Sequence, residues 1–540
     1  MIFHFSILLV LFTDLKFSAC NPITVQTPCG QIKGTQNVSF TFRGIRYAEA
    51  PVHTKRWTEP VLISPKSNNC WSGVLNATVF GENCVQRDVT DSSKVVGSED
   101  CLFLNVWTPT IDPNAKLPVM VFIPGGSLQE SGGSWPTYRP TEELANSTQI
   151  VYVSMNYRLQ AFGFMALDLI SVTSIQKTSG NYGFMDQIAV LNWVQEYITS
   201  FGGDPNQVTI FGQSSGGTSI LALLASPLAK GLFHKAWMLS ASPIMNKTYS
   251  DAANDNLIFL KRTGCTNITC LYDMSAEDIT KAVPWDIYPY WAMSDQSDLP
   301  VLNHFDGAIA IVDGYVLTDN PYKIFENGEG NDVPLMIGTT AQEVDFDPSP
   351  TNLKNWTWNN YRDHVTQKLG TFQGNTKDIV FQALQLYPIN IETPEFEFTS
   401  MVSDLRVTCP NEVMAKDIAL FFTSDVYRYV VTSRPSQPIH TVGIPFPASY
   451  SMHMWDLFGF FGTIKDYFTP KQSDIMFQNN IQQEILAFVR TGKPYTSAWS
   501  TVWDNVALLT NITEIADSYN SAQCHFWTIT AKMLPYAWIN

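Results

Sequence analysis

The chain has 540 residues, of which 45% are hydrophobic and only 15% are charged. This composition excludes a disordered chain, because disorder requires low hydrophobicity and high charge. The formal net charge is −16, from 33 Lys and Arg residues against 49 Asp and Glu residues. We therefore expect no nucleic-acid partner and no attraction to an anionic membrane surface, since both need a basic surface.

The first segment of the chain is typical of a secretory signal peptide. Residues 2–12 form an apolar run, and the small residues Ser18, Ala19 and Cys20 follow it. The run is shorter than the ~20 residues that span a bilayer, and its length suits a signal peptide; the alternative is a buried N-terminal strand. We predict a signal peptide over 1–20 and a single domain over 21–540, which has no second apolar run long enough for an integral membrane anchor.

The cysteines and the glycosylation motifs also fit an exported chain. Nine cysteines are present, and loss of Cys20 with the signal leaves an even number, whose pairing cannot be chosen by counting. No cysteine or histidine cluster has zinc spacing, so we expect no metal. The pattern Asn-x-Ser/Thr occurs at Asn37, Asn76, Asn146, Asn246, Asn267, Asn355 and Asn511. We predict a disulfide-bonded glycoprotein that is secreted or resides in the lumen of the secretory or endosomal pathway.

Short apolar runs alternate with helical patterns along the chain. The runs predict buried strands at 118–124, 150–155, 207–211, 235–239, 333–337 and 426–432. Apolar residues at helical spacing predict amphipathic helices over 185–200, which stops at Gly202, and over 473–491. This alternation predicts an α/β fold with a large, mostly parallel sheet and helices on both faces. The chemistry of such a sheet lies in loops at the carboxyl ends of its strands.

One of these strands leads directly into the segment Gly212-Gln213-Ser214-Ser215-Gly216. This is the G-x-S-x-G pattern between a strand and a helix, where glycines permit a sharp turn that exposes the serine. The start of the following helix offers free N–H groups to a developing anion. We predict that Ser214 is a catalytic nucleophile; the alternative is an ordinary helix N-cap rich in Gly and Ser.

A serine nucleophile needs a base, and the base needs an acid to orient it. In this architecture the chain order is Ser, then Asp or Glu, then His. That order leaves His364, His440, His453 and His525 as candidate bases. His453 lies in a loop after a late strand, where the base is expected, and His440 is a nearby rival. Glu343 lies just past the strand predicted at 333–337, where the acid is expected, and Asp345 and Asp347 are close rivals.

These motifs resemble those of the type-B carboxylesterase/lipase family, which includes the cholinesterases and has the α/β-hydrolase fold. Residues 201–217 resemble the family's nucleophile motif, and residues 98–107, Ser-Glu-Asp-Cys-Leu-Phe-Leu-Asn-Val-Trp, resemble its second signature. The resemblance extends from Gly30 to Trp527. It implies a triad of Ser214, Glu343 and His453, and thereby selects the acid and the base over their rivals.

The resemblance also implies how cysteines and some charges are paired. It implies the disulfides Cys84–Cys101, Cys265–Cys270 and Cys409–Cys524, and it leaves Cys29 and Cys70 to pair with each other. It further implies two ion pairs, Arg56 with Glu99 and Arg158 with Asp186.

The chain departs from the family pattern in the oxyanion loop. The family usually has His-Gly-Gly-Gly where this chain has Pro124-Gly125-Gly126-Ser127. The implied donors to an oxyanion are the backbone N–H groups of Gly126, Ser127 and Ser215. A serine keeps its N–H, so the loop retains all its donors if Ser127 adopts the backbone shape of the usual glycine.

Three further departures surround the nucleophile. Gln213 replaces the usual Glu, which removes a negative charge. Ser215 stands where Ala is usual, and we expect only its N–H to matter. Asp456 stands where the family often has Glu, and we expect it to contact Ser240.

The sequence therefore predicts a serine hydrolase that cleaves a small-molecule or lipid carboxylic ester through an acyl-enzyme, without a metal or cofactor. Because the family also contains non-catalytic members, the alternative is a binding, adhesion or storage protein on the same fold. Cholinesterases hold a quaternary ammonium on a tryptophan in the loop closed by the first disulfide. Here the loop from Val85 to Asp100 has no aromatic residue, so we expect choline esters to be poor substrates.

Overall fold

The computed structural model describes residues 21–285, 296–303, 309–372, 376–441, 444 and 446–539. The signal peptide predicted at 1–20 lies outside these residues. Within the described part, no helix combines the length and the apolar composition that a membrane span requires.

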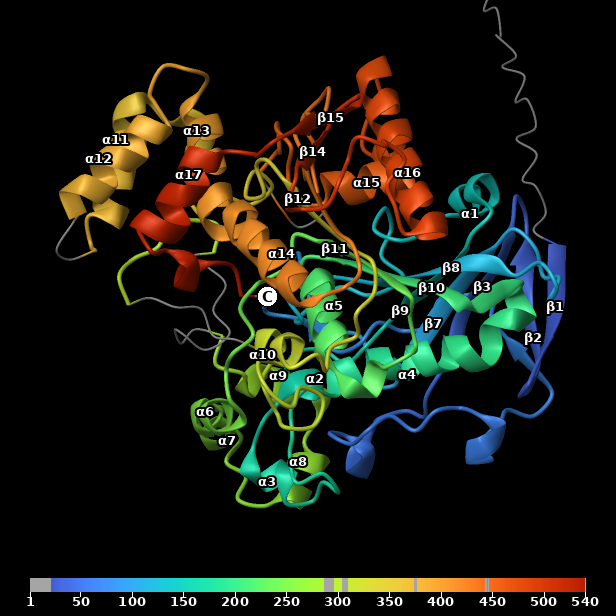
Figure 1. Ribbon diagram of the computed structural model, residues 1–540. Helices are drawn as coiled ribbons and strands as arrows, with labels where there is room; N and C mark the ends of the chain where they lie inside the picture. Colours follow the sequence, from blue (N-terminus) through green and yellow to red (C-terminus); the bar gives the residue numbers. More distant parts are fainter. Residues whose placement is uncertain are drawn as a thin grey trace, which may run out of the picture.

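A sheet of 13 strands crosses the molecule (Figure 1). In spatial order its main path is β1 (Asn21–Thr27), β2 (Gly30–Gln36), β3 (Phe40–Arg46), β7 (Phe103–Thr108), β9 (Val151–Met155), β8 (Leu117–Ile123), β10 (Gly203–Gln213), β11 (Lys235–Leu239), β12 (Leu335–Thr340), β13 (Val426–Val431), β14 (Val506–Leu509) and β15 (Thr513–Ala516); β4 (Val74–Asn76) pairs with β2. The seven strands from β9 to β14 are parallel to one another. The strands at both ends are antiparallel. A separate pair is formed by β5 (Gln86–Arg87) and β6 (Val95–Val96).

Helices cover both faces of the sheet, with α4 and α5 on one face and α1, α15 and α16 on the other (Figure 1). The helices are α1 (Glu142–Thr148), α2 (Gln160–Phe164), α3 (Asp168–Ser171), α4 (Tyr182–Tyr197), α5 (Ser215–Ala225), α6 (Tyr249–Asp255), α7 (Leu257–Thr263), α8 (Ile268–Asp273), α9 (Ala276–Ala282), α10 (Pro321–Glu326), α11 (Trp358–Leu369), α12 (Thr376–Leu386), α13 (Pro394–Ser403), α14 (Cys409–Phe421), α15 (Trp455–Phe461), α16 (Gln472–Thr491) and α17 (Ser521–His525).

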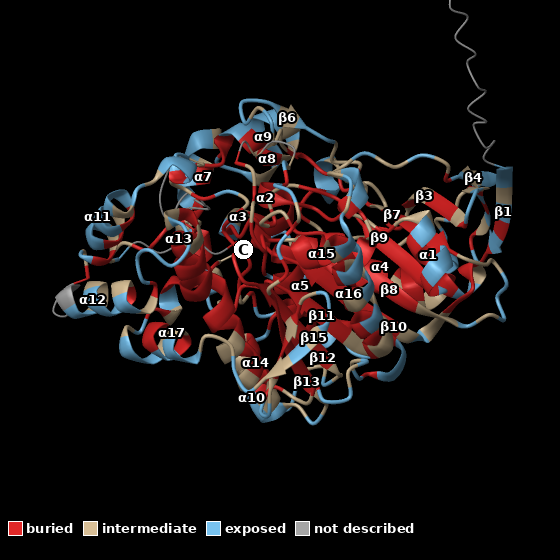
Figure 2. Cartoon of the chain, turned by 90° about the horizontal axis from the view of Figure 1, so that it is seen from above, coloured by how far each residue is buried: buried red, intermediate tan, exposed pale blue. Residues whose placement is uncertain are grey.

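The side chains of β8 pack into two hydrophobic cores, one on each face of the sheet. Its residues Val119 and Val121 pack into the core beneath α4 and α5. Their neighbours Met120 and Phe122 point to the opposite face and pack into the core beneath α15 and α16. Because successive strand residues face opposite sides, a strand that is covered twice must be apolar throughout. Figure 2 shows these central strands as buried, whereas α11, α12 and α17 expose one side.

The six strands predicted from the sequence are confirmed as β8 to β13, and the two helices as α4 and α16. The expectation that the first helix is amphipathic is wrong, because α4 is buried almost all round, including the polar side chains of Asp186 and Gln187. The antiparallel strands β1 to β3 and the hairpin of β14 and β15 were not predicted. Half-exposed strands such as β1 and β2 lack the continuous apolar run that marked the central ones.

Four disulfides join the expected partners: Cys29–Cys70, Cys84–Cys101, Cys265–Cys270 and Cys409–Cys524. The last one links the start of α14 to α17 across a sequence separation of 115 residues. Both of its cysteines lie within a third core, which is built from α11, α13 and the C-terminal segment.

Candidate active site

Ser214 occupies a sharp turn between β10 and α5. Its φ of 60° and ψ of −127° lie in a region that non-glycine residues rarely adopt. The flanking glycines make the turn possible, because a Cβ added to Gly212 would lie 2.4 Å from the carbonyl oxygen of Gly216. A Cβ on Gly216 would lie 2.1 Å from the carbonyl oxygen of Ile123 on β8. The turn therefore presents the Ser214 side chain at the carboxyl end of the sheet, against the start of α5.

His453 and Glu343 meet at the same end of the sheet. His453 Nδ1 lies 2.5 Å from Glu343 Oε2. The other oxygen, Oε1, accepts hydrogen bonds from Ser240 Oγ and from Thr340 N–H, each at 2.7 Å. The carboxylate is thus held from three sides. It keeps a proton on Nδ1 and leaves Nε2 as the acceptor nitrogen of the ring.

The loops that carry these two side chains are fastened to each other. Gln342, next to Glu343, forms a parallel bridge with Met452, next to His453. Its N–H donates to the Ser451 carbonyl at 3.0 Å. The 110 residues that separate acid and base in the chain are therefore brought together by the backbone as well as by the side chains.

The rival residues lie elsewhere. His364 Nε2 is 2.7 Å from Asp298 Oδ1, and His440 and His525 are exposed. Asp345 accepts hydrogen bonds from the N–H groups of Ser449 and Tyr450. The third acidic rival, Asp347, is exposed.

Two aromatic rings enclose the His453 imidazole. Phe346 stacks on it with ring centroids 5.2 Å apart, and Trp538 meets it edge to face at 4.9 Å. Trp538 is itself anchored, since its indole N–H donates to the Gln296 carbonyl at 2.8 Å and its carbonyl accepts from Ser242 Oγ at 2.5 Å. A segment near the C-terminus thus forms one wall of the site, and no sequence motif pointed to this.

The loop that follows β8 lies against the nucleophile. A Cβ added to Gly125 would be 3.0 Å from Ser214 Cβ. Gly126, Ser127 and Leu128 have φ values of 107°, 56° and 59°, so Ser127 adopts the left-handed backbone that glycine favours. The N–H groups of Gly126 and Ser127 donate to no other described residue. The Ser215 N–H lies in the first turn of α5, where backbone donors lack an intrahelical partner.

Neighbouring hydroxyl groups hold this loop in place. Ser215 Oγ accepts a hydrogen bond from Leu128 N–H at 3.0 Å. Tyr138 OH accepts one from Gly125 N–H at 3.2 Å, and Tyr157 OH donates to the Pro124 carbonyl at 2.8 Å. The expectation that only the N–H of Ser215 matters is wrong, because its hydroxyl anchors the loop.

Gln213 contacts the base directly. Its Nε2 lies 2.8 Å from His453 Nε2, and its Oε1 accepts from Tyr138 OH at 2.6 Å. In contrast, no hydrogen bond joins the described residues Ser214 and His453. The sequence indicated only that a charge is missing at Gln213; the contact with the base became visible in the fold.

No hydrogen bond joins the described side chains of Asp456 and Ser240, contrary to expectation. It accepts hydrogen bonds from Tyr429 OH at 2.8 Å and from Leu457 N–H at 2.9 Å, while Ser240 donates to Glu343. Burial, together with the nearby charge of Glu343, raises the pKa of Asp456 to about 7.

The two ion pairs implied by the family resemblance are present. Arg56 with Glu99 and Arg158 with Asp186 form two-pronged ion pairs, with N–O distances of 2.6 to 2.8 Å. All seven sequon asparagines are exposed. Among the described residues, no group of three His, Cys, Asp or Glu side chains could hold a metal ion.

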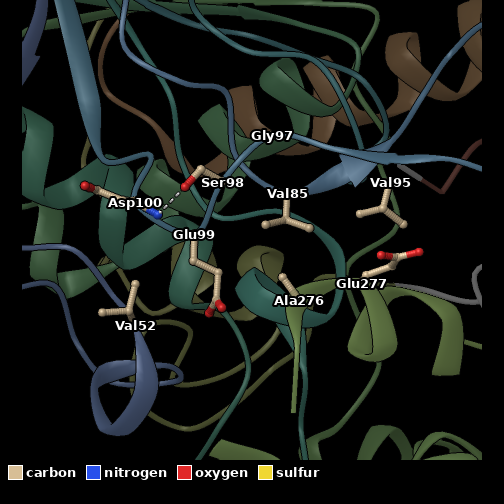
Figure 3. A pocket seen from close by; sticks show the side chains of 9 residues that line it. All are labelled: Val52, Val85, Val95, Gly97, Ser98, Glu99, Asp100, Ala276 and Glu277. Carbon is tan, nitrogen blue, oxygen red and sulfur yellow. Dashed lines mark hydrogen bonds between the residues drawn. The ribbon is translucent and has the colours of Figure 1, made fainter. Parts of the chain in front are cut away.

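A separate cavity of about 420 Å³ lies between the Cys84–Cys101 loop and α9 (Figure 3). Glu99, which lines it, is bound to Arg56. None of Ser214, Glu343 and His453 lines this cavity, so it is distinct from the site described above.

The protein is an α/β-hydrolase. Its mostly parallel sheet carries a serine on a sharp strand–helix turn, and a histidine–carboxylate pair and a loop of free N–H groups lie at the same end. Residues 21–527 match the model of the Carboxylesterase family, and the chain belongs to that family. The family and its esterase members make this protein a carboxylic ester hydrolase.

Individual relatives match this chain over most of its length. Para-nitrobenzyl esterase of Bacillus subtilis (strain 168) is 33% identical over 489 residues, which are 88% of this chain and 91% of that protein. A solved structure of PNB esterase matches with a TM-score of 0.71 and 30% identity, covering 93% of this chain and 98% of the other. Neurotactin of Drosophila melanogaster is 33% identical over 398 residues, which are 72% of this chain but only 45% of that protein.

Proposed function

We propose that this protein is a secreted or lumenal serine esterase, which cleaves small-molecule or lipid carboxylic esters through an acyl-enzyme on Ser214. The observation that carries the proposal is the 2.5 Å contact between Glu343 and His453, at the same end of the sheet as the Ser214 turn. This contact leaves His453 Nε2 as a proton acceptor, which a serine nucleophile requires.

The first half of the reaction forms the acyl-enzyme. Ser214 Oγ attacks the ester carbonyl carbon, and its proton moves to His453 Nε2. The carbonyl oxygen becomes an oxyanion, which accepts hydrogen bonds from the N–H groups of Gly126, Ser127 and Ser215. Glu343 stabilises the imidazolium without taking its proton. The carbon–oxygen bond to the alcohol then breaks, and the alcohol leaves with the proton from His453.

The second half repeats these steps with water. His453 takes a proton from a water molecule, whose oxygen attacks the acyl carbon. The second tetrahedral intermediate uses the same three N–H donors. Its collapse breaks the bond to Ser214 Oγ, which recovers a proton from His453 and releases the carboxylic acid.

The test is the substitution Ser214→Ala. It should abolish both the hydrolysis of a nitrophenyl ester and covalent labelling by an organophosphorus ester, because both need the hydroxyl. The exposed Ser518 provides a matched control, and Ser518→Ala should keep both activities. Undiminished hydrolysis by a folded Ser214→Ala protein would contradict the assignment. A panel of nitrophenyl esters of rising chain length would then establish the acyl preference.

Export is supported by the four disulfides and by the exposure of all seven sequon asparagines. We expect the mature chain to begin near Asn21, to carry N-glycans and to contain no free thiol. Intact-mass measurement before and after glycan removal tests this, and a chain that retains Met1 or has several free thiols would exclude it.

A second candidate is a binding, adhesion or storage protein that has kept the fold. Its support is the Gln213 amide on His453 Nε2, at the place where Ser214 must donate. Labelling by an organophosphorus ester separates the two candidates, since only a working nucleophile becomes labelled.

A further inference from the structure

The side chain of Gln213 has a defined orientation. Gly125 N–H donates to the hydroxyl oxygen of Tyr138, so the Tyr138 proton points away from Gly125 and toward Gln213 Oε1, 2.6 Å distant. A flipped amide would turn its NH₂ group to Tyr138 and leave the buried tyrosine proton without an acceptor, which is costly. The amide nitrogen of Gln213 therefore faces His453 Nε2.

The protonation of His453 follows from its two neighbours. Glu343 can only accept, so Nδ1 carries a proton. The Gln213 amide can only donate through Nε2, so the facing ring nitrogen must offer a lone pair. A doubly protonated ring would turn an N–H against an N–H. The Gln213 amide thus favours the neutral ring, whereas a carboxylate at this position would favour the protonated ring.

We propose that Gln213 is a positioning residue for the general base: oriented by Tyr138, it keeps His453 neutral and extends esterase activity to lower pH than a glutamate at the same position would allow. This inference rests on the proposed function of the site. It also implies an exchange of partners, because Ser214 has to replace the Gln213 amide at Nε2 before it can pass its proton to His453.

The other groups around His453 stay unchanged when Gln213 is replaced. Glu343 faces the ring from the loop after β12, and Asp456 lies near it on α15. The rings of Phe346 and Trp538 carry no charge. Burial and the charge of Glu343 raise the pKa of Asp456 to about 7, within the range of interest. Burial also raises the pKa of Glu130, in the loop after β8, to about 7, and raises that of Asp345, which contacts the His453 loop, well above its usual range. The experiment is therefore also run in an Asp456→Asn background.

The main variant is Gln213→Glu, which keeps an oxygen for the Tyr138 hydroxyl but presents a second oxygen to His453. We expect the acid-side midpoint of the kcat/KM profile to move up by about one pH unit, because the carboxylate stabilises the imidazolium. Gln213→Met removes the amide without adding charge, and it should give a smaller shift in the same direction. Tyr138→Phe should do likewise, since the amide then loses its orientation.

The exposed Gln472 provides the matched control. Gln472→Glu makes the same chemical change on an exposed side chain at the start of α16, and it should leave the profile unchanged. Near-ultraviolet circular dichroism shows which variants are folded. A Gln213→Glu midpoint equal to or below that of the wild type would overturn the inference, and so would a downward shift in Gln213→Met if only that variant folds.

A second measurement does not depend on activity. In protein labelled with ¹⁵N-histidine, NMR follows the ring nitrogens of His453 against pH. His453 of Gln213→Glu should become protonated at a higher pH than in the wild type, and coincident titrations would overturn the inference. If the wild type hydrolyses no ester, the proposed function fails, and this titration still decides the role of Gln213.

Discussion

The ion pair between Arg158 and Asp186 offers a sharp test of how the structure is stabilised. Asp186→Ala removes one partner of a pair with N–O distances of 2.7 and 2.8 Å. The two side chains are only 3% and 0% exposed. The Asp186 carboxylate also accepts from the Arg158 backbone N–H at 2.9 Å. Loss of the carboxylate therefore leaves a buried guanidinium that water cannot reach.

The expected magnitude follows from burial. Breaking a buried pair by removing one partner costs about 3–5 kcal/mol of unfolding free energy. The chain contains a matched exposed pair, Arg434 with Glu392, which is also two-pronged at 2.9 and 3.1 Å but 43% and 36% exposed. Pairs in water contribute about 0–1 kcal/mol, so Glu392→Ala should cost no more than that.

The assay is urea unfolding with the disulfides intact, followed by tryptophan fluorescence. Asp186→Ala should also lower kcat, because Arg158 directly follows Tyr157, whose hydroxyl holds the Pro124 carbonyl of the oxyanion loop. Asp186→Asn preserves the shape of the side chain, so its unfolding free energy should lie between those of the wild type and the alanine variant. Equal losses of unfolding free energy in Asp186→Ala and Glu392→Ala would refute the argument that burial makes the difference.

Three further predictions address the base, the pH dependence of stability and the substrate. His453→Ala should abolish ester hydrolysis while His440→Ala keeps it, because His453 contacts Glu343 and His440 is exposed. The reverse result in an esterase assay would mean that the base is wrongly assigned. Burial is the main cause that raises the pKa values of Asp404 and Asp456 from the ordinary 3.8 to about 7, so the folded state binds more protons than the unfolded state between these pH values. Unfolding free energy should therefore decrease as pH rises from about 4 to about 7. In thermal unfolding, the pH dependence of Tm should be smaller in Asp404→Asn than in the wild type. A stability that increases with pH over this window would contradict the prediction. Acetylthiocholine should be a poorer substrate than a neutral thioacetate, since the loop Val85 to Asp100 offers no aromatic face to a cation; a clear preference for the choline ester in a thiol-release assay would exclude this.

The central sheet and the nucleophile could be predicted from the sequence because both depend on local patterns. A strand that is covered on both faces must be apolar at every position, as in 118–124, and this run is visible in the chain itself. The turn at Ser214 needs glycines at 212 and 216 within a few residues, so strand, motif and helix appear as one segment. The edge strands were missed because their half-exposed faces leave only a weak pattern.

The acid and the base, unlike the nucleophile, could not be chosen from the residues alone, which left several histidines and carboxylates open. The family resemblance made the choice. What the sequence by itself determined was the residue types, their order along the chain and the place of the nucleophile. Only the tertiary structure decided which side chains meet: Glu343 with His453, Ser215 with Leu128, and Gln213 with the base. Such contacts join residues up to 240 positions apart. They are created by the packing of whole elements, which no local pattern of residues encodes.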